Sequence, residues 1–392
     1  MKAKFLVGLL LLALPDSAFA AAPPALQNSA FIDQVRTLLM LQDLAAAGNR
    51  DAPALEKKII VDIAAAARAG QLPKADDTRE ANAAIALTLS GGPPGIAEAL
   101  LKSGELPALQ ARVLEGAVAF KRGDAPTAAR LLRDIDPVRL PQSMGGRVAL
   151  MQAMLAPDKD IAKRRDLLAL AAALMPGTLV EDAALRRAAA LAAVAADPHE
   201  LWRTAGRYLR RMGASLYAKP FVEQTAVQVL ALARKDKPID ATKLDELFNL
   251  LRREDRLSVY LGLAKQATAS GLQEFAQFAA ARARRLATEG SPSWQRANLY
   301  DAAWAIAGPD YERTAEKLKG LNGELLPADD RPLLNTALDV AARIRADRPA
   351  GKEIIDPAEM KSQLPQEQAQ LVTAVGSAVA DADKLLRSLA TP

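Results

Sequence analysis

Apolar residues recur three and four positions apart along most of the chain, and Gly, Pro or Asp interrupts them roughly every 15 to 35 residues. This spacing lines up apolar side chains on one face of an α-helix. Helix start signals agree. Asp197-Pro198 and Ser291-Pro292 each place a capping side chain before a proline, and Thr178 with Glu181 has the form of a capping box. The pattern predicts an all-α protein with helices of about 10 to 20 residues.

Some intervals are typical of degenerate tetratricopeptide units. After Gly123 and after Gly271, a helix ends and the next helix presents an alanine five positions later, at Ala128 and Ala276. A small residue there lets the two helices of a hairpin approach closely. Alanine-rich helices bury little apolar area one by one, so they are stable when each hairpin leans on its neighbours. We therefore predict a curved α-solenoid of stacked hairpins over residues 28–345.

The two ends of the chain differ from this pattern. Lys2 and Lys4, an apolar run from Phe5 to Leu14, and Ala18-Phe19-Ala20 predict a cleavable signal peptide at residues 1–20, followed by a leader at 21–27. No later segment is long and apolar enough to span a membrane, so we expect a periplasmic protein with no transmembrane segment after signal cleavage. Residues 346–368 are predicted to be a linker with a short helix, and 369–390 an amphipathic helix that packs on the solenoid or pairs with another helix.

Composition removes most catalytic chemistry. The 392 residues include no cysteine and one histidine, His199, which is expected on the surface at a helix start. Disulfides, thiolate metal sites and any triad or metal site that needs two residues of the histidine or cysteine type are excluded, and no phosphate-binding glycine loop is present. Paired acids such as Asp76-Asp77 and Asp329-Asp330 are read as solvated turns or caps. We predict no catalytic, cofactor-binding or metal-binding residues, and the net charge of +5 does not indicate nucleic acid.

Two regional features lie in the second half. Aromatic residues are concentrated between Trp202 and Tyr311, either as core or as the lining of a ligand groove. Four arginines form a stripe along one predicted helix, and we call this stripe, Arg203, Arg207, Arg210 and Arg211, the arginine face. A turn predicted over 213–221 presents two aromatic side chains beside it. It is either a solvated face or a docking face for an acidic protein, an anionic cell-wall polymer or lipid headgroups. The candidate partner-binding residues are Arg203, Arg207, Arg210, Arg211, Tyr217 and Phe221.

The order of four segments resembles the MotC family, periplasmic motility proteins of alphaproteobacterial flagellar systems. The segments are LTLSGGPPG at 87–95, LPQSMGGRVALM at 140–151, MPGTLVEDAALRR at 175–187 and RYLRRMGASLYAKPF at 207–221. None of them is a catalytic signature. The resemblance implies a non-enzymatic accessory protein of the flagellar motor that associates with the periplasmic part of the stator protein MotB, and it implies no cofactor.

Two alternatives remain open. One is a general scaffold or chaperone for envelope assembly. The other is an enzyme of cell-wall turnover, because helical superhelices similar to this one occur in soluble lytic transglycosylases. The Glu-Ser and Gly-Leu-Met-Gln motifs of those enzymes are missing from this sequence. Contact with peptidoglycan remains compatible with all three hypotheses.

Overall fold

The computed structural model describes residues 29–234, 241–306, 308 and 310–347, and every regular element in these ranges is a helix. The first half holds α1 (Ala30–Ala46), α2 (Ala52–Arg68), α3 (Thr78–Leu89), α4 (Pro94–Ser103), α5 (Ala108–Lys121), α6 (Ala125–Leu132), a 3-10 turn η1 (Pro137–Arg139), α7 (Gln142–Leu155), α8 (Ile161–Leu174) and α9 (Leu179–Val194). The second half holds α10 (Pro198–Met212), α11 (Ala218–Ala233), α12 (Ala241–Phe248), α13 (Arg253–Ala269), α14 (Gln273–Leu286), α15 (Pro292–Ala305), α16 (Tyr311–Lys319), a 3-10 turn η2 (Gly323–Leu325) and α17 (Arg331–Asp347). The prediction of an all-α fold is confirmed.

The predicted caps start the helices. The Asp197 carboxylate accepts the N–H of Glu200 at 3.0 Å at the start of α10, and Ser291 accepts the N–H of Trp294 at 3.2 Å at the start of α15. Thr178 caps α9, but the capping box differs from the prediction: Glu181 accepts the N–H of Gly177 at 2.7 Å. The sequence therefore marks the helix starts correctly.

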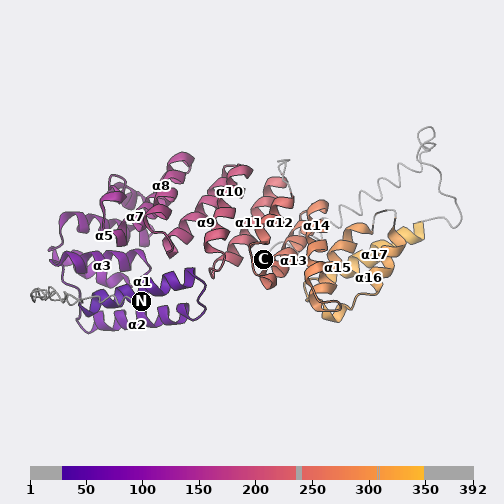
Figure 1. Ribbon diagram of the computed structural model, residues 1–392, viewed down its shortest axis with the longest axis horizontal. Helices are drawn as coiled ribbons and strands as arrows, with labels where there is room; N and C mark the ends of the chain where they lie inside the picture. The colour runs from indigo at the N-terminus through magenta and orange to yellow at the C-terminus, as the bar shows by residue number, and fades with distance from the viewer. Residues whose placement is uncertain (1–28, 235–240, 307, 309, 348–392) are drawn as a thin grey trace, which may run out of the picture.

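Neighbouring helices pack against one another in hairpins such as α5–α6, α7–α8, α9–α10 and α13–α14, and these follow each other along an elongated molecule (Figure 1). Gly123 and Gly271 adopt φ of 79° and 73°, a left-handed conformation that glycine tolerates, at the turns between two such helices. Ala128 and Ala276 are fully buried in the following helices. In both hairpins the glycine thus forms the turn, and the small alanine five positions later is buried as predicted.

The core runs through the stack in patches. One patch lies mainly within α1 to α7 and is aliphatic, a second extends from α7 to α15, and a third joins α15 to α17. Most of the large aromatic side chains lie in the second patch, where Tyr208, Phe248, Tyr260 and Tyr300 are all almost fully buried. The aromatic cluster therefore contributes core residues, as one of the two sequence interpretations expects.

The buried tyrosines repeat one arrangement. Each hydroxyl donates a hydrogen bond to an aspartate that also pairs with an arginine: Tyr208 with Asp182 and Arg186, Tyr260 with Asp245 and Arg282, and Tyr300 with Asp330 and Arg296. Burial raises the pKa of all three tyrosines, so the hydroxyls stay protonated as donors. Asp330 is 1% exposed, so the expectation that Asp329-Asp330 is a solvated turn or cap is wrong for Asp330, whereas Asp329 is exposed.

The predicted signal peptide, leader and helix 369–390 lie outside the described residues, as do residues 348–368 of the predicted linker. The last described helix, α17, ends at Asp347, close to the predicted solenoid boundary at 345. In the described ranges, no helix combines the length and apolarity required to cross a bilayer.

Candidate functional site

The four segments that carry the family resemblance meet in one region of the structure. They contribute the turn after α3, helix α7, the start of α9, and α10 with the turn into α11. The end of α1 joins them, because Asp43 accepts the N–H of Leu179 at 2.9 Å and the carbonyl of Ala45 accepts the N–H of Leu216 at 3.2 Å. We call this region the junction and define it by Asp43, Ser90, Arg147, Glu181, Asp182 and Arg211.

Asp182 is completely buried at the centre of the junction. Its carboxylate accepts hydrogen bonds from Tyr208 at 2.9 Å, from Ser215 at 2.8 Å and from Arg186 at 2.6 Å. A buried carboxylate is costly unless hydrogen bonds and an opposite charge compensate it, and here both are present. The cluster fixes α9 against α10 and the α10–α11 turn.

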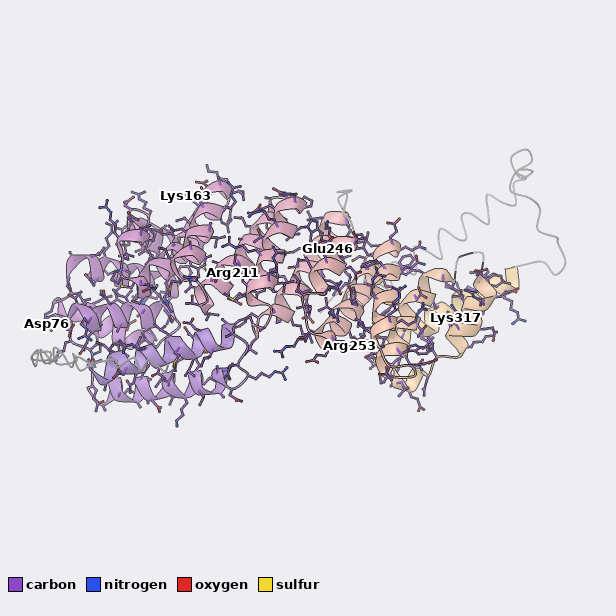
Figure 2. The ribbon with its side chains drawn as sticks, in the orientation of Figure 1. Asp76, Lys163, Arg211, Glu246, Arg253 and Lys317 are labelled. Atoms are coloured by element: carbon purple, nitrogen blue, oxygen red, sulfur yellow. The ribbon has the colours of Figure 1, made fainter. Side chains whose placement is uncertain are left out.

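Glu181, the preceding residue, is also buried but has a different partner. It forms a two-pronged ion pair with Arg211, in which Nη2 lies 2.9 Å from Oε2 and Nε contacts Oε1. The bond to Glu181 raises the pKa of Arg211. Arg211 lies near the middle of the molecule (Figure 2). It therefore acts first as a clamp between α10 and α9, whatever else it contacts.

The arginine face divides into paired and unpaired residues. Arg203 pairs with Glu200, with Nε 2.8 Å from Oε2, and Arg211 pairs with Glu181. Arg207 and Arg210 are exposed on α10, and neither has a hydrogen bond or ion pair to the part of the chain that the structure describes. The free positive charge of this face thus comes from Arg207 and Arg210, which sequence alone does not reveal.

The two aromatic candidates have different surroundings. Tyr217 is half-buried at the end of the turn, with the Arg186 guanidinium 4.9 Å from its ring centroid, and burial raises its pKa. Phe221 lies within α11, is 5% exposed, and packs 4.3 Å from the Tyr208 ring. The expectation that a turn presents Phe221 at the surface is wrong, because the turn ends at Tyr217 and α11 directs Phe221 into the core.

Arg147 is the most buried arginine of the junction. It is 6% exposed and donates to Ser90 Oγ at 2.9 Å and to the Ser143 carbonyl at 2.7 Å. Burial lowers its pKa to about 10, which the Asp43 charge only partly offsets. The guanidinium is therefore still charged at neutral pH, at a cost on the order of 3 kcal/mol. Burial likewise raises the pKa of Asp43, against the effects of the Leu179 N–H and of Arg147.

Sequence reasoning missed Asp43, Arg147 and Asp182. The available signal was position: Glu181 and Asp182 fall among apolar residues near the start of a helix, and Arg147 falls in an otherwise apolar run. A charge at such a position requires a partner in the fold. His199 is exposed, as predicted, and the described residues contain no group of three or more His, Cys, Asp or Glu side chains arranged to hold a metal.

Comparisons with known proteins agree with this picture. A family model described as "Chemotaxis protein MotC" matches residues 1–391. A curated relative from Rhizobium meliloti (strain 1021), also named "Chemotaxis protein MotC", is 28% identical over 335 residues, which cover 81% of this chain and 76% of the relative. No solved structure matches the chain. The family model covers nearly the whole chain, including all four junction segments, and the chain therefore belongs to the MotC family of motility and chemotaxis proteins.

Proposed function

We propose that this protein is a non-enzymatic accessory protein of the flagellar motor, which acts in the periplasm and supports motility by associating with the periplasmic part of the stator protein MotB. Membership of the MotC family is the observation that carries the proposal. The signal-peptide pattern at residues 1–20 supports export, and the lack of cysteine together with a single exposed histidine supports a binding role.

We place the MotB contact on the arginine face, around Arg207 and Arg210. Their charges have no carboxylate partner among the described residues, so they are available to an acidic partner. Arg203 and Arg211 flank them with charges that Glu200 and Glu181 largely offset. Tyr217, half-buried against the Arg186 guanidinium, supplies an aromatic side chain in the turn that follows α10. Opposite charge at the rim of an interface mainly accelerates encounter and selects the partner.

The decisive experiment is a charge reversal with a matched control. We expect Arg207→Glu/Arg210→Glu to weaken binding to the purified periplasmic part of MotB about tenfold or more at low ionic strength, because attraction becomes repulsion. Lys57→Glu/Lys58→Glu makes the same charge change on two exposed lysines of α2 and should bind normally. Equal binding by both double variants would remove this face from the proposal.

Deletion of the gene separates the proposal from a general envelope scaffold or chaperone. Loss of swimming in soft agar with filaments still assembled supports a role at the motor, whereas a broad envelope defect supports the scaffold. Pelleting with isolated peptidoglycan tests direct wall contact, and zymography tests the cell-wall enzyme. Export is checked by mass spectrometry, with Ala21 as the expected first residue of the mature chain.

A further inference from the structure

A small pocket opens beside the junction, between α1, α3, α5, α7 and α9. Its volume is about 230 Å³, and its walls are mostly apolar, with Phe120, Met151, Met154 and Leu179 among them. Sites for cofactors and drug-sized ligands usually measure about 300–1,000 Å³. The pocket is thus too small for a nucleotide-sized group and suits one or two amino-acid side chains.

Arg147 lines this pocket with one donor group still unused. Its Nε is taken by Ser90 at 2.9 Å, and its Nη1 by the Ser143 carbonyl at 2.7 Å and Met175 Sδ at 3.5 Å. Nη2 makes no hydrogen bond to the described residues. Among these residues, Arg256 Nε is the sole side-chain polar atom that is both fully buried and without a partner, so Nη2 of Arg147 is not fully buried. Nη2 therefore keeps some accessible surface, and Arg147 is one of the residues that line the pocket.

The other polar side chains that line the pocket, Gln42 and Ser90, already make hydrogen bonds. The Gln42 amide nitrogen donates to Glu56 at 2.8 Å and to the Ser90 carbonyl at 2.9 Å. Asp43 is held by the Leu179 N–H and, like every other carboxylate of the described residues, lies more than 4.0 Å from the Arg147 guanidinium. A charged donor with no direct counter-charge, set among apolar walls, matches a ligand that brings a carboxylate and an apolar group together.

We propose that this pocket binds a protein partner through an acidic side chain that pairs with Arg147 and an adjacent apolar side chain that packs against Phe120, Met154 and Leu179. A peptide segment fits the pocket better than a free metabolite, because its volume accommodates side chains and its mouth is open enough to leave Met154 38% exposed. The inference concerns a surface other than the arginine face and does not depend on the proposed association with MotB.

The test uses two terminally blocked peptides, acetyl-Ala-Glu-Leu-Ala-amide and its Gln counterpart, with full-length protein carrying ¹³C-labelled methionine methyl groups. The Met151 and Met154 signals should shift in a saturable manner with the Glu peptide at concentrations up to about 10 mM, as expected for a weak isolated contact. The Gln peptide should bind about fivefold or more weakly, because it lacks the charge that pairs with the guanidinium. Absent saturation, or equal affinity for both peptides, would overturn the proposal.

A substitution at the pocket mouth, and not at Arg147, keeps the test independent of the structural role of Arg147, which also ties α7 to the turn after α3. Met154→Glu places a carboxylate at the pocket mouth and should abolish the Glu-peptide response at Met151, while the melting temperature stays near that of the parent. Val194→Glu introduces the same negative charge at a side chain that is 76% exposed and does not line the pocket, and it should leave binding intact. Undiminished binding by Met154→Glu would show that the peptide lies elsewhere.

Discussion

The carboxylate of Asp43 accepts a hydrogen bond from the backbone N–H of Leu179 at 2.9 Å, across 136 positions of sequence. Leu179 is the first residue of α9, where backbone N–H groups have no partner within the helix. Asp43 therefore caps α9 from the end of α1. In an ideal solenoid each repeat contacts only its neighbours. This contact bypasses the intervening helices and couples the N-terminal hairpin to the middle of the molecule.

Removal of this cap should weaken the coupling. We expect Asp43→Ala to lower the free energy of unfolding by about 1 kcal/mol, because the Leu179 N–H loses its acceptor. Asp43→Asn keeps an oxygen acceptor without a buried charge and should cost less. Urea unfolding followed by circular dichroism measures both. A loss as large for Asn as for Ala would mean that the charge, and not the hydrogen bond, holds the two helices together.

The turns after α1 and after α2 offer a matched pair of glycines. Gly48 and Gly70 both have positive φ, 97° and 83°, but an added Cβ at Gly48 would lie 2.2 Å from the carbonyl oxygen of Ala214, whereas at Gly70 it would meet nothing within 4 Å. Gly70→Ala should therefore cost about 1 kcal/mol of backbone strain, and Gly48→Ala about 2–4 kcal/mol because the α1–α2 turn must also move away from the α10–α11 turn. Thermal denaturation compares them. Similar melting temperatures for the two variants would argue against this close approach.

The Asp182 cluster should be among the most sensitive sites in the described part of the chain. Asp182→Asn leaves Arg186 without its counter-charge next to a buried amide, so we expect a loss of about 3 kcal/mol. Tyr208→Phe removes one of three donors to the carboxylate and should cost about 1 kcal/mol. Chemical denaturation of both variants, with a double variant to measure coupling, checks this. Additive losses would show that the groups do not act as one cluster.

The lowered pKa of Asp245 makes the free energy of unfolding depend on pH. Burial opposes its ionisation, but hydrogen bonds from Arg282 and Tyr260 outweigh burial and lower its pKa. An aspartate in the unfolded chain has a pKa of about 3.9, so the stabilisation is fully present above that pH and is lost as the pH falls towards the lower pKa of the folded state. Urea midpoints measured from pH 6 downwards should fall less steeply below about pH 4 in Asp245→Asn than in the parent protein. Identical slopes would contradict this assignment.

Local sequence determined where the helices begin and end. Asp197, Ser291 and Thr178 each satisfy backbone N–H groups within a few residues, and the glycine turns at Gly123 and Gly271 require a conformation that few other residues adopt. These interactions depend only on chain neighbours, so the pattern of residues is enough to predict them. The lack of cysteine and the single histidine likewise limited the chemistry without any knowledge of the fold.

Only the tertiary structure decided which charges are free. The four arginines at positions 203, 207, 210 and 211 cannot be told apart in the sequence. In the structure, Arg211 pairs with Glu181 on α9, whereas Arg207 and Arg210 form no ion pair in the described ranges. Phe221 reads as a surface aromatic but is buried. The packing of α10 against α9 brings Arg211 to Glu181, which lies 30 positions earlier, and the packing of α1 against α9 brings Asp43 to Leu179 across 136 positions. No local pattern encodes such distances, because they depend on how all the intervening helices pack.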